Sequence, residues 1–158
     1  MEDKLMTDLA LSHYTREPLK FDKFREYRQP DGSDYGYAKP RGFWVSVDGE
    51  HDWATWCEDE HFNEEGLANK TAFRLKWDSQ VLIIRDMDQI MEFTDRFGIQ
   101  YHEVLRGIKW KLVATIYDGI IITPYLWEGR YDMKTGWYYG WDCASGCVWN
   151  LDAIEKVA

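Results

Sequence analysis

The sequence predicts an α+β fold in a single compact domain that spans residues 1–158. Three observations lead to this prediction. The length suits one hydrophobic core, the segments rich in β-forming residues are short, and only two or three helical patterns separate them. Because strands and helices do not alternate regularly, a parallel α/β sheet is not expected.

The first third of the chain predicts two strands separated by a loop. Residues 9–14 are mainly apolar and end in polar side chains, as a first strand does. Residues 27–41 are rich in Gly, Pro, Asp and Ser, which favours a surface loop. Residues 42–47 read Gly-Phe-Trp-Val-Ser-Val and predict the second strand.

The middle of the chain predicts two helices with strands between them. Residues 51–60 favour a helix because apolar and polar residues recur at helical spacing, namely Trp53, Trp56, Cys57 and Glu60. Residues 63–70 are polar and predict a loop, whereas residues 73–77 alternate and residues 81–84 are continuously apolar, so both are strand candidates. A second helix is expected after Asp86, which can cap it with Gln89 in the capping-box position, and Gly98 is a natural stop. Its apolar face comprises Met87, Ile90, Met91 and Phe97.

The last third contains one ambiguous segment. Residues 108–117 fit a helix through Trp110, Val113 and Tyr117, and they fit a strand equally well through the alternate set of apolar positions. A turn at Asp118 precedes a strand over residues 119–123. After Pro124 the aromatic-rich sequence predicts irregular structure, followed by a last strand around residues 147–149.

Composition narrows the functional classes. The chain has 19 Lys and Arg against 28 Asp and Glu, a net charge of −9, which argues against broad nucleic-acid binding but leaves room for a localised basic site. No apolar run approaches the ~20 residues that span a bilayer, and the first residues do not resemble a secretory signal. Three cysteines suggest a reducing compartment without a disulfide scaffold. We therefore expect a cytoplasmic protein without membrane association.

Aromatic residues are unusually frequent. The chain contains nine Trp, ten Tyr and seven Phe. Such side chains can fill the core of a small domain, or they can form a site that stacks a planar ligand. Composition leaves both interpretations open.

Two separated motifs carry a resemblance to a known family. The first is Leu-Ser-His-Tyr-Thr at residues 11–15, and the second is Gly-Phe-Trp-Val-Ser at residues 42–46, followed by Ala-Thr-Trp-Cys at residues 54–57. Together they resemble the NAD site of the ADP-ribosyltransferase superfamily, on the branch with a His-Tyr-Glu triad that includes diphtheria toxin and the poly-ADP-ribose polymerases. More loosely, residues 117–121 and 145–154 resemble later strands of bacterial relatives.

The resemblance implies a split antiparallel β core and specific roles for several residues. His13 corresponds to the His that hydrogen-bonds the nicotinamide-side ribose, and Thr15 to a residue that supports it. Trp44 stands in place of the triad Tyr and Trp56 in place of a second stacking aromatic. Gly42 and Ser46 belong to the same NAD-binding strand, and a Gly beside the ring lets the backbone approach the carboxamide. NAD would be the substrate, and the acceptor a protein or a nucleic acid.

The sequence departs from the family at the catalytic acid. The closing strand of the relatives begins with Glu, whereas the matching position here is Ser145, or Gly146 with a slip of one residue. Asp142, three residues upstream, is the nearest preceding carboxylate, and Glu128 lies further back; these two are the candidates for this role. Loss of such an electrostatic group costs roughly 10²–10³ in rate. The protein therefore either uses one of these carboxylates or binds the dinucleotide without cleaving it.

Each candidate residue also has an interpretation without chemistry. His13 can be a structural His that binds one backbone carbonyl, Trp44 and Trp56 can belong to the core, Asp142 can cap a turn, and Glu128 can be a solvated loop charge. Cys143 and Cys147 lack a second ligand pair at zinc spacing, so no metal site is expected.

Three functional hypotheses remain from the sequence. The first is an enzyme that cleaves NAD and transfers ADP-ribose. The second is a catalytically degenerate nucleotide-binding or protein-interaction module on the same fold, of the kind with which phages or mobile elements interfere with a host. The third is an interaction protein that uses an exposed aromatic patch.

Overall fold

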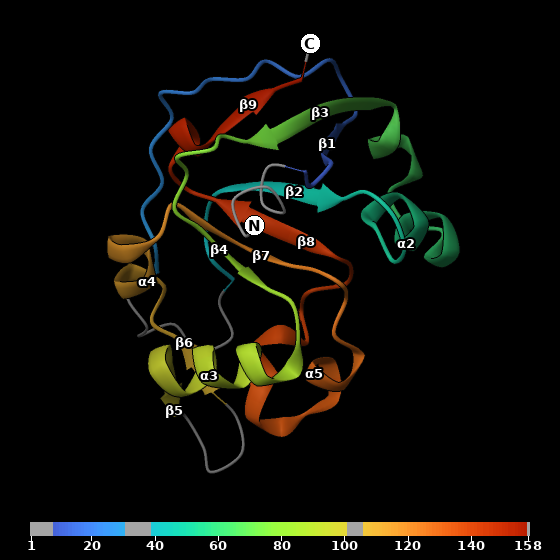
Figure 1. The fold of residues 1–158 in the computed structure, drawn as a ribbon. Helices are drawn as coiled ribbons and strands as arrows, with labels where there is room; N and C mark the ends of the chain where they lie inside the picture. Colours follow the sequence, from blue (N-terminus) through green and yellow to red (C-terminus); the bar gives the residue numbers. More distant parts are fainter. Residues whose placement is uncertain (1–7, 31–38, 101–105, 158) are drawn as a thin grey trace.

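The computed structural model describes residues 8–30, 39–100 and 106–157, and it confirms the α+β class in one compact domain (Figure 1). The strands are β1 (Leu11–Thr15), β2 (Phe43–Val47), β3 (Asn69–Leu75), β4 (Val81–Ile84), β5 (Gly98–Gln100), β6 (Arg106–Ile108), β7 (Gly119–Ile122), β8 (Ser145–Val148) and β9 (Ile154–Lys156). The helices are α2 (Trp53–Glu60), α3 (Met87–Phe97), α4 (Trp110–Ile116) and α5 (Trp127–Tyr131), with 3₁₀ turns η1 (Glu64–Leu67), η2 (Met133–Tyr138) and η3 (Leu151–Ala153).

Seven of the strands form one curled sheet in the order β4-β7-β8-β2-β1-β3-β9 (Figure 1). All neighbouring strands are antiparallel except β4 and β7, which are parallel. A parallel pair needs a long crossover, and here it contains α3, the β5–β6 hairpin and α4. The continuous apolar sequences of β4 and β7 fit this arrangement because both strands are almost completely buried.

Helix α3 begins and ends where the sequence predicts, with two differences in detail. The Asp86 carboxylate accepts a hydrogen bond from the Gln89 backbone N–H at 2.8 Å, but the Gln89 side chain accepts from Arg85 rather than from Asp86. Gly98 has extended dihedral angles and begins β5, so the helix ends without a left-handed glycine. Ile90, Phe93 and Phe97 are the buried face of the helix.

The ambiguous segment resolves into both elements, one after the other. Strand β6 ends at Ile108 and helix α4 begins at Trp110. Trp110 and Val113 are buried while Leu112 is exposed, so burial follows the helical spacing. The alternative interpretation of this segment as a strand is therefore wrong from Trp110 onward.

Three sequence predictions of irregular structure are also corrected. The expected loop over residues 63–70 contains η1 and the first two residues of β3, and the aromatic stretch after Pro124 folds into α5 and η2. The last residues add an unpredicted strand, β9, at the edge of the sheet. Trp77, expected within a strand, lies beyond β3 and is 81% exposed. The expected loop over residues 27–41 lies partly outside the described residues, and its described ends have no helix or strand.

Ten aromatic side chains in the described part of the chain are buried in the core. Trp110 packs near Phe93, Trp137 and Trp149, with ring centroids 5.8–6.4 Å apart. The buried indole N–H of Trp137 donates to the Thr94 hydroxyl at 2.9 Å, and that of Trp149 donates to the Tyr117 carbonyl. The core interpretation of the high Trp content is therefore correct for this cluster, none of whose four rings lines the cavity described below.

A prediction follows from the centre of the sheet. A Cβ at Gly146 in β8 would overlap the Ile121 side chain and lie 2.7 Å from the carbonyl oxygen of Ile120 on β7. Gly146→Ala should therefore lower the free energy of unfolding by about 1–3 kcal/mol or more, measured by urea denaturation. Gly140→Ala is the control, because its nearest neighbour is the flexible end of Lys39 at 3.1 Å. Equal stability of the two variants would contradict the close packing of β7 against β8.

Candidate functional site

A cavity of about 370 Å³ lies over the three neighbouring strands β8, β2 and β1. Ligand sites are typically concave, apolar pockets of roughly 300–1,000 Å³ with a few polar groups. This cavity has that character, because aromatic rings, serines, one cation and one carboxylate line it, among them Tyr14, Lys39, Trp44, Ser46, Trp53 and Asp142.

Serines from three strands line up along the floor of the cavity. Ser12 pairs with Ser46 across β1 and β2, and Ser46 pairs with Ser145 across β2 and β8. All three hydroxyls are engaged within the protein. Ser12 donates to Asp48 at 2.7 Å, Ser145 donates to the Cys143 carbonyl at 3.0 Å, and Ser46 accepts from the backbone N–H of Trp53 at 2.9 Å. Ser46 therefore fixes the first residue of α2 above the sheet.

Tryptophans form the walls of the cavity. Trp44 on β2 meets Trp141 edge to face, with ring centroids 5.0 Å apart. Trp53 stacks on Trp56 at 5.2 Å and an interplanar angle of 12°. The ammonium group of Lys39 lies 5.5 Å from the centre of the Trp44 ring. A planar ligand would thus meet aromatic surface and a positive charge at the same place.

Strand alternation places His13 and Trp44 on different faces of the sheet. The register puts Ser12 and Ser46 opposite each other, so His13 shares the other face with Phe43. The His13 ring stacks on the Phe43 ring with centroids 4.1 Å apart, and its Nδ1–H donates to the Trp44 carbonyl at 2.6 Å. Burial lowers the pKa of His13, which favours the neutral imidazole. His13 thus has the contacts of a structural His at the border between two cavities.

The second cavity, of about 250 Å³, shares His13 and Trp44 with the first. It is lined on the other side by the segment around Phe21, Arg25 and Tyr27. His13 and Trp44, which are joined by the hydrogen bond from the His13 ring to the Trp44 carbonyl, thus lie between two hollows.

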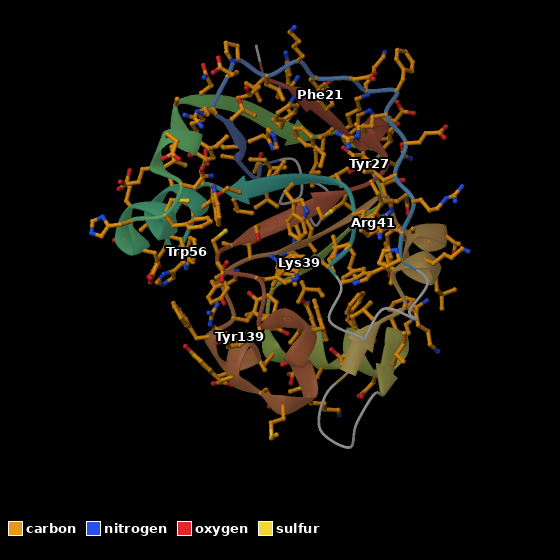
Figure 2. The ribbon with its side chains drawn as sticks, turned by 180° about the vertical axis from the view of Figure 1, so that it is seen from behind. Phe21, Tyr27, Lys39, Arg41, Trp56 and Tyr139 are labelled. Carbon is orange, nitrogen blue, oxygen red and sulfur yellow. The ribbon has the colours of Figure 1, made fainter. Side chains whose placement is uncertain are left out.

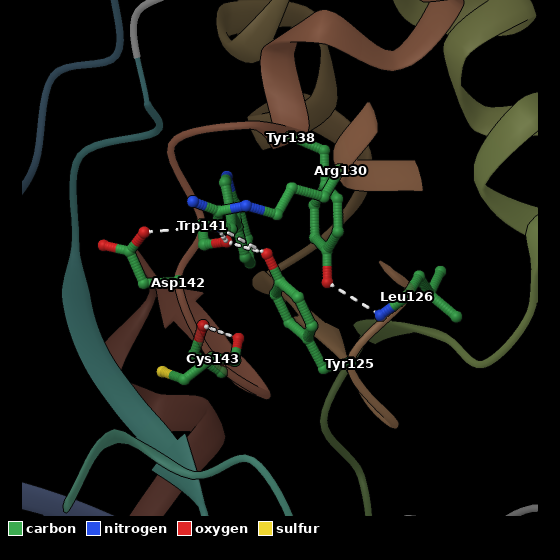
Figure 3. Close-up of polar contacts among 8 residues, drawn as sticks. Tyr125, Leu126, Arg130, Tyr138, Trp141, Asp142 and Cys143 are labelled. Atoms are coloured by element: carbon green, nitrogen blue, oxygen red, sulfur yellow. Dashed lines mark hydrogen bonds and ion pairs between the residues drawn. The ribbon is translucent and has the colours of Figure 1, made fainter. Parts of the chain in front are cut away.

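Asp142 is the one carboxylate among the described residues that line the first cavity, which we call the main cavity. Its Oδ1 lies 3.3 Å from Nη1 of Arg130, which also donates to the Tyr125 hydroxyl and to the Trp141 carbonyl (Figure 3). The Tyr125 hydroxyl donates to the same carbonyl at 2.6 Å. Burial raises the pKa of Tyr125, so the phenol keeps its proton and can donate. This network holds Asp142 three residues before the start of β8.

The remaining candidates lie outside the lining of the main cavity. Trp56 is separated from it by Trp53 in the stacked pair, and Glu128 is exposed on α5. The Thr15 hydroxyl is buried without a hydrogen bond to the described residues, including His13. A Cβ at Gly42 would lie 2.7 Å from the Cys147 Sγ and the Val148 carbonyl oxygen, so this glycine allows β2 to approach β8.

Several lining residues were missed by sequence reasoning. Tyr14 and Ser12 flank the predicted His13, and strand alternation could have shown that these two side chains share one face of β1, opposite to His13. Trp53 carried the same helical signal as Trp56 but was not selected. Lys39 and Trp141 lie in segments without regular periodicity, and no sequence signal identified them.

The cysteines lie in the interior of the described chain. All three are buried and free, and burial raises the pKa of Cys143 to about 12, so this cavity-lining group is a neutral thiol. Among residues 8–30, 39–100 and 106–157, no three His, Cys, Asp or Glu residues are grouped in a way that could hold a metal ion. Within the same ranges, no helix has the length and apolar character needed to cross a membrane.

Comparisons of the chain with protein-family models, with curated proteins and with solved structures found no match. The cavity and the strands beneath it are therefore the basis for assigning a function.

Proposed function

We propose that this protein is an NAD-binding, ADP-ribosyltransferase-like enzyme that cleaves the nicotinamide–ribose bond and transfers ADP-ribose to a macromolecule. One observation carries the proposal. The three segments that the resemblance assigns to the triad are β1, β2 and β8, and these strands are direct neighbours beneath one cavity. Their proximity requires two long-range pairings, so it is independent evidence beside the motifs themselves.

The walls of the cavity suit the nicotinamide end of NAD. The oxidised nicotinamide ring is flat and electron-poor, and it is attracted to aromatic faces such as those of Trp44 and Trp53. Lys39 supplies a positive charge beside Trp44, where it can pair with a phosphate of the dinucleotide. His13 acts as a positioning residue, because its ring holds the backbone carbonyl of Trp44.

We assign to Asp142 the role that the catalytic Glu plays in the family that the chain resembles. When the nicotinamide–ribose bond breaks, nicotinamide leaves with the bonding electron pair, and positive charge develops on the ribose carbon. A fixed carboxylate nearby stabilises that charge. The acceptor then forms its bond to the same carbon and loses a proton. Arg130 and the Tyr125 network keep Asp142 oriented beside β8 for this task.

A specific feature favours a second candidate function. The first residue of β8 is Ser145, whose hydroxyl already binds the Cys143 carbonyl, and Asp142 is paired with Arg130. A chain that lost its catalytic Glu and kept its cavity would bind NAD without cleaving it. On this alternative the protein is a nucleotide-binding module on the same fold.

Calorimetric titration of NAD, with free nicotinamide assayed in the same samples, tests both candidates. The expected result is saturable binding with nicotinamide release, and a loss of binding of tenfold or more in Trp44→Ala. Trp56→Ala is the matched control, because its ring lies outside the cavity lining, and it should retain binding within about threefold. Binding without nicotinamide would support the second candidate. Absence of binding, or equal losses in the two variants, would overturn the assignment of the cavity.

A further inference from the structure

A basic and aromatic segment runs along the second cavity, in a protein that is otherwise strongly acidic. Residues 16–41 contain seven Lys and Arg against five Asp and Glu, whereas the rest of the chain has a net charge of −11. Within this segment, Lys20, Lys23, Arg25 and Arg28 all have exposed side chains. We call residues 20–28 together with Arg41 the basic strip.

Aromatic residues alternate with these cations. Lys23 lies over the Phe24 ring at 5.1 Å, and Arg25 lies over the Tyr27 ring at 4.9 Å. Phe24 is 79% exposed. The fold therefore lacks the stabilisation of about 1.5–3 kcal/mol that burial of this side chain would contribute. Its exposed face is therefore available to a planar partner.

The basic strip is continuous with the second cavity and close to the first. Lys20, Phe21, Arg25 and Tyr27 line the second cavity together with one carboxylate, Asp22, and the cavity shares His13 and Trp44 with the main one. Arg41 is tied to the strip because its guanidinium donates to the Arg28 carbonyl at 3.2 Å. In Figure 2, Phe21, Tyr27, Arg41 and Lys39 follow one another across one face of the molecule toward the middle of the sheet.

We propose that the basic strip binds single-stranded nucleic acid, with a base or sugar entering the second cavity and phosphates contacting the flanking cations. Alternating cations and aromatic rings are what a flexible strand requires, because phosphates pair with Lys and Arg while unstacked bases lie on aromatic faces. A partner protein with an acidic surface would pair with the cations, but it would have little need of exposed planar rings. A duplex presents no free base to stack.

The acidic charge of the rest of the chain favours binding of the nucleic acid at the basic strip over binding elsewhere on the surface. Phosphates are repelled by the acidic end of α2, where Glu58, Asp59 and Glu60 follow one another, and they are attracted along the strip. A strand on the strip would place a nucleotide next to the NAD cavity, across His13 and Trp44. If the proposed function holds, this nucleic acid is the acceptor of ADP-ribose; the binding itself does not depend on that function.

Fluorescence anisotropy with labelled twelve-residue oligouridylate and oligodeoxythymidylate tests this proposal in the absence of NAD. We expect saturable binding at 50 mM salt that Lys23→Ala/Arg25→Ala weakens at least tenfold and Phe24→Ala at least threefold. The salt slope, log Kobs against log salt, should become shallower by roughly 0.7 for each phosphate contact removed.

Two matched controls separate a specific surface from bulk charge. Lys111→Ala/Lys156→Ala removes the same charge from exposed positions outside the strip, and Trp77→Ala removes an equally exposed aromatic side chain. Both should change affinity less than twofold. Equal losses in controls and strip variants, absence of oligonucleotide binding, or preferential binding of oligoglutamate would overturn the proposal. These outcomes leave the NAD titration unaffected, so the two proposals fail separately.

Discussion

Replacing Asp142 by Asn should reduce nicotinamide release from NAD by roughly 10²–10³, the cost of losing one fixed group that stabilises developing charge. The amide keeps the size of the carboxylate but loses its negative charge. NAD affinity should change much less, because the charge it stabilises is absent in the ground state. Nicotinamide release under single-turnover conditions, together with calorimetric binding, measures the two effects separately.

Glu128→Gln is the matched control for this experiment. Both carboxylates were candidates from the sequence, but Glu128 is exposed on α5 and outside the lining of the cavity. Its variant should release nicotinamide at the normal rate. A large loss in Glu128→Gln with normal activity in Asp142→Asn would show that the other carboxylate performs this step.

Replacing Trp110 by Ala should lower the free energy of unfolding by about 3–5 kcal/mol. This side chain is 1% exposed and packs near Phe93, Trp137 and Trp149, where α3, α4 and η2 meet under the sheet. Removing the indole leaves a cavity between rings that cannot all move inward. Chemical denaturation followed by circular dichroism measures the change.

Trp77→Ala provides the comparison, since this indole is 81% exposed on the turn after β3. Its removal should change stability by no more than about 0.5 kcal/mol. A similar loss of stability in both variants would contradict the division of the tryptophans into a buried cluster and exposed residues.

Local sequence signals determined most of the elements. The apolar run of β4, the capping residue Asp86 and the helical spacing around Trp53 each act over a few residues, so the pattern alone is sufficient. The errors fall where local patterns are degenerate. In residues 108–117 the apolar positions satisfy both periods, and only packing of Trp110 against α3 and η2 selects the helix.

The candidate site shows the same division. The motifs identified β1 and β2 and the residues His13 and Trp44, but not that alternation directs their side chains to opposite faces of the sheet. That outcome depends on the pairing of Ser12 with Ser46, a contact between residues 34 positions apart. Likewise, selecting Asp142 over Glu128 requires the position of both relative to the cavity, which no local pattern encodes.

The sequence by itself determined the α+β class, the strands that carry the motifs and the excess of aromatic residues, because propensity and periodicity are properties of neighbouring residues. Tertiary structure decided which aromatics fill the core and which line the cavity, which carboxylate lies beside β8, and that Lys20 and Arg25 line a second hollow. These outcomes depend on long-range strand pairing, where a shift of one residue in register would turn every side chain to the other face.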